Sequence, residues 1–293
     1  MTERASREPI ASAPAPRPQA HCAVTSPPPR AVSALCEVVW HRAVNDRYRH
    51  IAVTAPNAAL GAAPGQFFQL LCPGQGEGTH FLRRPMSVYR VARDAGRLEF
   101  LYKVAGTGTR RLAELLPGDR LDIFGPLGRG FRLEPSWRHV VLLGRGVGLA
   151  TLAPLAEAAK SQGIEVTAVL SAARAKYVMS VEHLRSVGAK VIVVTDEDGS
   201  AEPSRVETLL RGLIEQHGCD LIATCGSNRL LQMVRELGRD LGIAGQVALE
   251  QQMACGIGMC QCCVRLFRGA DGIEPRRVCH DGPVFDVQET LSW

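Results

Sequence analysis

The spacing of hydrophobic residues changes near His139, and this change constrains the fold more strongly than any other feature of the chain. Before it, short apolar or alternating runs are separated by Gly, Pro, Asn and Asp, a pattern typical of antiparallel strands. The runs are 34–40, 49–55, 66–72, 86–91, 98–104 and 120–124. Residues 31–134 are therefore expected to form a six-stranded antiparallel β-barrel, interrupted by one helix over 109–115.

From His139 onward, segments with the pattern of strands alternate with segments that have the pattern of helices. Strands are expected at 140–143, 165–170, 190–194 and 220–224, and helices at 149–161, 204–217 and 228–241. Strands that alternate with helices form a parallel sheet covered on both faces. The chain is thus expected to be an α+β multidomain protein, with an α/β domain at 135–245 and a small module at 246–293.

The ends and the composition of the chain exclude several classes of protein. Residues 1–30 are rich in Ala, Pro, Ser and Arg and are expected to be a disordered leader. No apolar run reaches the ~18 residues that span a bilayer, and no apolar signal-peptide core is present. A cytoplasmic protein is expected. The net charge is +5, but no basic stretch is interleaved with aromatic residues, so nucleic-acid binding is not expected.

Four cysteines near the C-terminus have the spacing of a plant-type [2Fe–2S] site. Cys255, Cys260 and Cys263 form the pattern C-x4-C-x2-C, and Cys279 follows on a separate segment. Three thiolates on one tight loop surround one side of a cluster, and the fourth closes the other side. Cys262 does not fit this spacing and is expected to be a neighbouring free thiol.

Two glycines between the first cysteines favour iron over another metal. Gly256 and Gly258 permit backbone conformations that other residues avoid, so that backbone amides can point at the sulfurs. A structural zinc site with four thiolates is the alternative. Zinc sites usually present two short C-x-x-C-like pairs, whereas here the fourth cysteine stands alone.

Three segments of the barrel suit a flavin with a pyrophosphate. The first begins at Arg84, whose planar guanidinium matches phosphate oxygens. A second segment ends the following strand, and a third places glycine amides at the start of a helix, where the dipole favours an anion. The candidate FAD contacts are Arg84, Pro85, Met86, Ser87, Leu101, Tyr102, Lys103, Gly108 and Thr109. Taken alone, each motif also fits an edge-strand proline beside a solvated arginine or an ordinary turn.

A nicotinamide site is expected at the carboxyl edge of the parallel sheet, where ligands of such sheets bind. One glycine-rich loop follows the first strand of the α/β domain and precedes a helix, and a Cys-Gly turn ends a later strand. The candidate residues are Gly144, Gly146, Gly148, Cys225 and Gly226. Leu149 stands where the usual dinucleotide fingerprint has its last glycine, so a plain tight turn and a buried small cysteine remain alternatives.

The order of these parts resembles the electron-transfer subunits of dihydroorotate dehydrogenase, within the ferredoxin–NADP reductase-like class. The resemblance covers roughly residues 31–289 and is most specific at 253–258 and 277–286. It implies FAD in the barrel, NAD on the α/β domain and one [2Fe–2S] cluster held by the four cysteines. It also implies a separate catalytic subunit that contains FMN, in a heterotetramer.

The resemblance further implies a relay in pyrimidine biosynthesis, in which electrons pass from FMN through the cluster and FAD to NAD⁺. No catalytic residue is then required on this chain. Arg145, Thr151 and Ser227 depart from the family pattern near the nicotinamide site. Arg174 and Lys176 follow the second strand of the α/β domain, where related reductases bind a 2′-phosphate, so NADP stays open.

Two other functions fit parts of the same pattern. The first keeps both cofactors but places the chain in another NAD(P)H oxidoreductase complex, of the ferredoxin–NADP, sulfide dehydrogenase or hydrogenase type. The second is a zinc-stabilised interaction module without enzymatic activity. The identity of the partner and the metal content distinguish these functions from the first.

Overall fold

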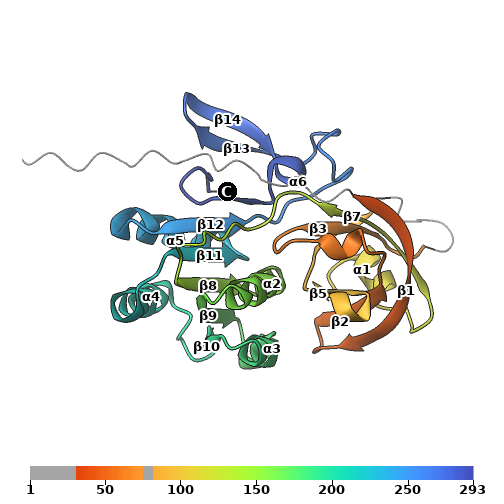
Figure 1. The fold of residues 1–293 in the computed structure, drawn as a ribbon, viewed down its shortest axis with the longest axis horizontal. Helices are drawn as coiled ribbons and strands as arrows, with labels where there is room; N and C mark the ends of the chain where they lie inside the picture. The colour runs from red at the N-terminus through yellow and green to blue at the C-terminus, as the bar shows by residue number, and fades with distance from the viewer. Residues whose placement is uncertain (1–30, 75–81, 293) are drawn as a thin grey trace, which may run out of the picture.

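The computed structural model describes residues 31–74 and 82–292, which form a β-barrel, an α/β domain and a C-terminal segment that lies across both (Figure 1). This arrangement confirms the α+β multidomain class expected from the sequence. The expected disordered leader, residues 1–30, lies outside the described residues. Within the described ranges, no helix is both long enough and apolar enough to cross a membrane.

The first sheet of the described chain contains seven strands, each antiparallel to its neighbours. They are β1 (Val32–Ala43), β2 (Tyr48–Thr54), β3 (Phe67–Leu71), β4 (Arg84–Ser87), β5 (Arg90–Ala92), β6 (Arg97–Lys103) and β7 (Arg120–Leu127). Their order across the sheet is β4-β3-β7-β1-β2-β6-β5. The connections contain η1 (Ala59–Gly61), η2 (Arg93–Ala95) and helix α1 (Thr107–Leu112).

The sheet closes into a barrel because its two edge strands are consecutive in the chain. Only Val88 and Tyr89 separate β4 from β5. The amide of Val88 donates to Gln66 beside β3, and the amide of Tyr89 donates to Glu99 on β6. The sequence predicted one strand at 86–91, and the structure divides it because the two halves pair with opposite edges of the sheet. Closure of this kind leaves few backbone groups unpaired at the edges.

Strand β3 presents one face to the barrel interior and the other to the C-terminal segment, because successive side chains of a strand point in opposite directions. Phe68 is fully buried inside the barrel, where its ring meets Phe100 edge to face at 5.7 Å. Phe67 points the other way and packs in an apolar cluster that includes Cys263 and Cys279. The outer wall of the barrel therefore contacts the segment that contains the clustered cysteines.

The second sheet has the strand order β10-β9-β8-β11-β12-β15. Its strands are β8 (His139–Arg145), β9 (Glu165–Ala172), β10 (Lys190–Thr195), β11 (Leu221–Cys225), β12 (Ala244–Ala248) and β15 (Val284–Asp286). The first five strands in this order run parallel, and β15 runs antiparallel to β12. The helices around it are α2 (Gly148–Ser161), α3 (Val181–Ser186), α4 (Pro203–His217) and α5 (Asn228–Leu241), with η3 (Ala175–Tyr177) before α3.

The seven elements predicted between residues 140 and 241 are confirmed, with ends within two residues of those expected. Helices α2 and α3 cover the face of the sheet that is turned toward the barrel, and α4 and α5 cover the other face (Figure 1). Tyr48, Tyr89 and Leu101 of the barrel pack in the same apolar core as α2. The barrel and the α/β domain thus share a core along α2.

The C-terminal segment is built into the α/β sheet. It contains a hairpin of β13 (Val264–Gly269) and β14 (Gly272–Arg277), the short helix α6 (Val278–Asp281), and then β15. Strand β12 spans residues 245 and 246, where the sequence predicted the start of a separate module, and β15 pairs with it. The domain limits therefore stay a prediction, although the hairpin itself stands outside the sheet.

Candidate cofactor-binding site

A cavity of about 790 Å³ lies where the barrel, helix α2 and the segment before Cys255 meet. A volume of this size is typical of cofactor pockets. Seven of the nine residues expected to contact FAD line it, namely Arg84, Pro85, Met86, Ser87, Leu101, Tyr102 and Lys103. The remaining lining residues are Phe67, Leu82, Arg83, Val147, Ala150, Thr151, Leu249, Glu250, Gln251, Gln252, Met253, Ala254, Cys262 and Pro283.

Gly108 and Thr109, the other two expected contacts, lie beside the cavity rather than in its wall. A Cβ atom on Gly108 would come within 3.0 Å of the Arg84 Nε atom, so the guanidinium lies against this glycine. The Thr109 hydroxyl accepts hydrogen bonds from the amides of Ala105 and Gly106, at 2.9 and 3.0 Å. Gly108 leaves room for Arg84, and Thr109 fixes the turn before α1.

The ring of Tyr102 lies in the barrel core, although the residue also borders the cavity. His41 Nδ1 lies 2.9 Å from the Leu115 carbonyl, so this nitrogen has the proton and Nε2 is the acceptor. The Tyr102 hydroxyl therefore donates to His41 Nε2, at 2.9 Å. Burial raises the pKa of the Tyr102 phenol, which keeps it protonated as this donor.

A hydrogen bond joins the barrel to α2 at the wall of the cavity. The Thr151 hydroxyl donates to the Ser87 hydroxyl at 3.0 Å, and both residues line the cavity. Thr151 is one of the three departures from the family pattern, which commonly has proline there. The structure explains this departure, since a proline has no hydroxyl with which to reach Ser87.

Replacing Arg84 by alanine is expected to weaken the retention of FAD. A hydrogen bond to a charged group contributes about 1.5–3 kcal/mol, so loss of the guanidinium corresponds to binding weaker by roughly ten- to a hundredfold. The measurement is the ratio of flavin to protein after gel filtration. The control is Arg111→Ala, which removes an exposed guanidinium of α1 that pairs with Glu114, two residues after the end of the helix. Equal flavin content in both variants would remove Arg84 from the site.

Two loops meet at the carboxyl edge of the parallel sheet, where the sequence predicted the nicotinamide. A Cβ atom on Gly148 would lie 2.5 Å from the Cys225 carbonyl oxygen, and one on Gly226 would collide with the Arg145 carbonyl. Gly226 also has a φ of +118°, which residues with side chains rarely adopt. Both glycines are therefore required where the loop after β8 contacts the loop after β11.

Two more glycines and a serine shape the same edge. A Cβ atom on Gly144 would lie 2.6 Å from a methyl group of Leu149, and Gly146 has a φ of +59°. The Ser227 hydroxyl accepts a hydrogen bond from the Leu230 amide at 3.3 Å and so caps the N-terminus of a helix. Ser227, a departure from the family pattern, thus begins α5.

Arg145, the remaining departure, connects the ends of three parallel strands. Its guanidinium donates to the Ser171 hydroxyl at 2.8 Å and forms a two-point contact with the Asp196 carboxylate. Asp196 belongs to the acidic loop after β10. Lys176, a candidate for binding a 2′-phosphate, instead pairs with Asp46 of the barrel at 3.4 Å. Arg145 and Lys176 are thus both paired with carboxylates, whereas Arg174, the other candidate, is exposed.

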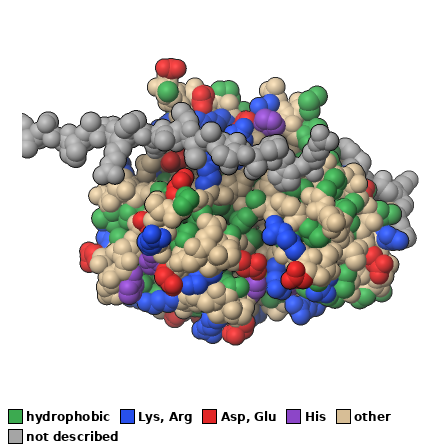
Figure 2. Space-filling view, viewed as in Figure 1, with side chains coloured by type: hydrophobic (Ala, Val, Ile, Leu, Met, Phe, Trp, Pro, Cys, Tyr) green, Lys and Arg blue, Asp and Glu red, His purple; other side chains and the backbone are tan. Residues whose placement is uncertain are grey.

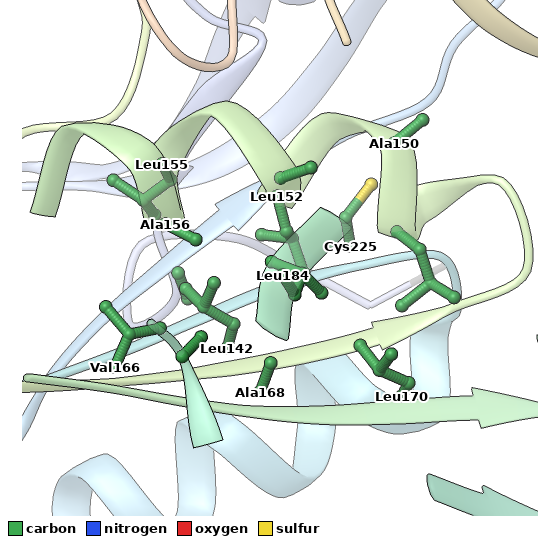
Figure 3. Close-up of a cluster of buried hydrophobic side chains, with 14 of the residues drawn as sticks. Leu142, Ala150, Leu152, Leu155, Ala156, Val166, Ala168, Leu170, Leu184 and Cys225 are labelled. Atoms are coloured by element: carbon green, nitrogen blue, oxygen red, sulfur yellow. The ribbon is translucent and has the colours of Figure 1, made fainter. Parts of the chain in front are cut away.

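Cys225 is buried, with 2% of its surface exposed. Figure 3 shows its sulfur among Ala150 and Leu152 of α2. Burial raises the pKa of this thiol, which therefore stays protonated. The structure places the Cys225 backbone at the edge of the sheet and its side chain in the core behind α2.

The cysteine loop, residues 255–263, directs backbone amides at its sulfurs. Gly256 and Gly258 have φ angles of +74° and +83°, as the sequence led us to expect. The Gly258 amide donates to the sulfur of Cys279 at 3.2 Å, and the Cys260 amide donates to that of Cys255 at 3.4 Å. Burial acts to raise the pKa of the Cys255 thiol, but this amide and that of Ile257 lower it to about 6.

The four candidate ligands form two pairs. In the first pair, the Cys260 amide donates to the Cys255 sulfur. In the second pair, the Cys279 amide donates to the Cys263 sulfur at 3.3 Å. Two pairs of thiolates with amides at the sulfurs fit a cluster of two irons.

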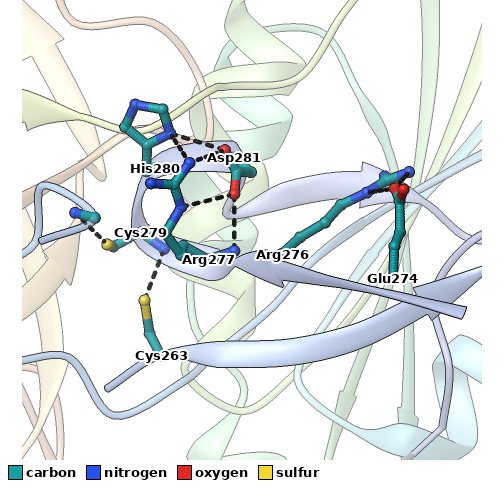
Figure 4. Close-up of polar contacts among 8 residues, drawn as sticks. Cys263, Glu274, Arg276, Arg277, Cys279, His280 and Asp281 are labelled. Carbon is teal, nitrogen blue, oxygen red and sulfur yellow. Dashed lines mark hydrogen bonds and ion pairs between the residues drawn. The ribbon is translucent and has the colours of Figure 1, made fainter. Parts of the chain in front are cut away.

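Arg277 and Asp281 stabilise helix α6, on which the cysteine loop packs (Figure 4). The Arg277 guanidinium donates to both oxygens of Asp281, at 3.2 Å each, and its amide donates to the same carboxylate at 2.8 Å. These contacts span the residue Cys279 and stabilise α6. A Cβ atom on Gly258 would lie 3.0 Å from His280, so the cysteine loop packs directly on this helix.

The cavity expected to hold FAD and the cysteine loop share a wall. Met253 and Ala254, which precede Cys255, line the cavity, and so does Cys262. This segment was not predicted from the sequence to be part of the FAD site. Its signal was the position of Met253 and Ala254 within the most family-specific motif, where they stand directly before the first cluster cysteine. The cavity and the cysteine loop are therefore adjacent, since one continuous segment borders the cavity and contains the candidate ligands.

Two family models match the chain. Residues 37–131 match an oxidoreductase FAD-binding domain, and residues 250–291 match the iron–sulfur cluster binding domain of dihydroorotate dehydrogenase B. A solved structure of an NADH-dependent reduced ferredoxin–NADP oxidoreductase is 29% identical, with a TM-score of 0.73 over 87% of this chain and 89% of that one. A ferredoxin–NADP⁺ reductase from Neisseria gonorrhoeae, 21% identical with a TM-score of 0.57 over 72% of this chain and 92% of that one, has the same fold.

The fold, the cavity and the paired cysteines thus define an FAD- and [2Fe–2S]-containing oxidoreductase of the ferredoxin reductase-like fold. A relative from Caldanaerobacter subterraneus subsp. tengcongensis, the electron transfer subunit of dihydroorotate dehydrogenase B, is 35% identical over 78% of this chain and 87% of its own length. The corresponding subunit from Geobacillus thermodenitrificans is 31% identical over 87% and 96%. The chain belongs to the family of dihydroorotate dehydrogenase B electron transfer subunits.

Proposed function

We propose that this chain passes electrons from the FMN of a dihydroorotate dehydrogenase catalytic subunit to NAD⁺, by way of a [2Fe–2S] cluster and FAD. The observation that supports this most strongly is the wall shared by the flavin cavity and the cysteine loop. Relatives are named as electron transfer subunits of an NAD⁺-dependent dihydroorotate dehydrogenase, an enzyme of pyrimidine biosynthesis. No residue of the chain is assigned a catalytic proton transfer.

In this proposal, the protein places the cofactors and the cofactors perform the redox chemistry. When bound, FAD would supply the exchange of one hydride for two single electrons, and the cluster would supply the transfer of single electrons. Arg84 holds the pyrophosphate, and Ser87 is fixed by Thr151 at the cavity wall. The thiolates that hold the cluster are Cys255, Cys260, Cys263 and Cys279.

The nicotinamide nucleotide is proposed to bind at the carboxyl edge of the α/β sheet, over Gly144, Gly146 and Gly148. Cys225 and Gly226 contribute only backbone groups to this site, since the Cys225 side chain is buried. Domain limits of 31–134, 135–245 and 246–293 are retained in this proposal, with the last two sharing one sheet.

The catalytic partner is proposed to bind over the cysteine loop, in a heterotetramer of the two kinds of subunit. Met259 and Ile257 of this loop are 77% and 46% exposed. Exposed apolar side chains that cluster together are typical of protein interfaces. On the face in Figure 2, Lys and Arg side chains lie interspersed with Asp and Glu over the described residues.

The test is to purify the chain together with its native partner under anaerobic conditions and to assay dihydroorotate-dependent reduction of NAD⁺. The expected complex contains FMN, FAD, iron and acid-labile sulfide, and reduces NAD⁺ only when both subunits are present. A complex that lacks this activity would contradict the proposal.

A second function has support from one comparison. The solved structure of the NADH-dependent reduced ferredoxin–NADP oxidoreductase superposes on most of this chain. If that function holds, the purified complex reduces NADP⁺ with reduced ferredoxin and is inactive with dihydroorotate. A colourless protein with stoichiometric zinc would contradict both redox functions.

A further inference from the structure

Gln69, on the outer face of strand β3, is buried between the barrel and the cysteine loop. None of its surface is exposed to solvent. Its neighbour on the same face of β3, Phe67, lines the flavin cavity, and so does Pro85, its partner on β4. Gln69 is therefore next to the flavin site, although it does not itself line the cavity.

The backbone of the cysteine loop rests directly on the Gln69 side chain. The Gln69 amide nitrogen donates to the Ala254 carbonyl at 3.5 Å, a long hydrogen bond. A Cβ atom on Gly256 would lie 2.8 Å from that nitrogen and 3.1 Å from a methyl group of Leu127. Gly256 is thus required here by contact with the barrel as well as by its φ angle.

The other end of the Gln69 carboxamide has no partner among the described residues. Its oxygen, Oε1, is buried and accepts no hydrogen bond. Buried polar atoms in native proteins are nearly always paired, because an unpaired one loses its hydrogen bonds to water without replacement. Exchanging the oxygen and nitrogen of the carboxamide would leave one end equally unpaired. Gln69 therefore retains a hydrogen-bonding group that is available to the loop beside Cys255.

We propose that Gln69 is a positioning residue for electron transfer, whose carboxamide bonds the cysteine loop of the cluster-loaded protein and sets the separation between flavin and cluster. The inference rests on the proposed function. The geometry supports it because Ala254 lines the flavin cavity, and Gly256 directly follows the candidate ligand Cys255. A shift of this loop on Gln69 changes the separation between the two sites.

The experiment compares the protein loaded with FAD and cluster with its Gln69→Met variant, which keeps the length of the side chain but removes the carboxamide. NADH is mixed with each under anaerobic conditions, and each NADH supplies two electrons as a hydride, of which the cluster accepts one. The rate at which NADH bleaches the flavin absorbance is expected to be the same in both proteins. Reduction of the cluster is expected to slow severalfold, because the rate of electron transfer falls as the separation between flavin and cluster grows.

Two further measurements separate positioning from a structural role. The electron paramagnetic resonance spectrum of the reduced cluster is expected to change in Gln69→Met, because a group that bonds its loop is lost. The melting temperature is expected to be unchanged or higher, since methionine replaces a buried polar group that is not fully paired. A residue that only stabilises the fold would lower the melting temperature and leave the spectrum unchanged.

Gln66→Met is the matched control, three residues away and equally buried. The Gln66 carboxamide accepts from the Ala63 amide and donates to the Gly128 carbonyl, both at 2.8 Å within the barrel. This control is expected to lower the melting temperature and to leave the cluster spectrum and its rate of reduction unchanged. Equal cluster reduction in Gln69→Met and the unsubstituted protein, or equal slowing in both variants, would overturn the inference. If NADH does not reduce the flavin of the unsubstituted protein, the proposed function itself is refuted.

Discussion

Replacing Cys260 by serine is expected to remove the cluster and to leave FAD bound. Serine keeps the size of the side chain but ionises far less readily than a thiol, so one iron loses a ligand. Cys260 is exposed and contributes little packing, whereas the flavin cavity is lined by other residues. Iron and acid-labile sulfide are expected to fall to background, with the ratio of flavin to protein unchanged. Metal analysis and the visible spectrum of anaerobically purified protein measure both.

The matched control is Cys262→Ser, two residues along the same loop. Cys262 is also exposed, and its thiol lies near the Gln252 carbonyl rather than beside another cysteine sulfur. This variant is expected to retain iron and sulfide in full. If iron persists in Cys260→Ser and is lost in Cys262→Ser, then Cys262 is the ligand and Cys260 is not.

Replacing Gly226 by valine is expected to slow reduction of the flavin by NADH by up to about a hundredfold. A side chain at this position would collide with the Arg145 carbonyl, and the φ of +118° strains any residue with a Cβ atom. The loops after β8 and β11 would then separate at the expected nicotinamide site. A misplacement of about 1 Å lowers a rate by up to roughly a hundredfold, so a loss approaching this size is expected. Stopped-flow absorbance of the flavin measures the rate.

Dithionite provides the internal check for this variant, because it reduces flavin and cluster without the nucleotide site. Normal reduction by dithionite with slow reduction by NADH is the expected pattern. Gly212→Ala in α4 is the control, since a Cβ atom there contacts nothing within 4 Å. It is expected to stabilise the protein by up to about 1 kcal/mol, because alanine favours helix over glycine, and to keep the NADH rate. A normal NADH rate in Gly226→Val would exclude this edge as the nucleotide site.

Much of the fold could be predicted from local patterns. The strands and helices of the α/β domain follow from periodicity, because each hydrophobic face must be buried whatever its exact neighbour is. The strand expected at 86–91 is instructive, since its residues do form strands. Its division at Val88 and Tyr89 depends on which edge of the sheet each half meets, and local spacing contains no such information.

The candidate site was partly accessible in the same way. The cysteine spacing and the left-handed glycines Gly256 and Gly258 are local features of one loop, and seven of the nine expected FAD contacts line one cavity. Arg145 was only a departure from a family pattern until its contact with Asp196, 51 residues away, gave it a structural role. Cys225 was expected to line the nicotinamide pocket, whereas packing against α2 buries its thiol.

The sequence by itself determined the kinds of elements, the spacing of the thiolates and the family, because these depend on residues near one another in the chain. Only the tertiary structure decided that the flavin cavity and the cysteine loop share a wall. Behind that wall, the Gln69 side chain contacts Ala254, which is 185 positions away in the chain. Such contacts depend on how the barrel, α2 and the C-terminal segment pack together, and no periodicity or motif within a single segment records that packing.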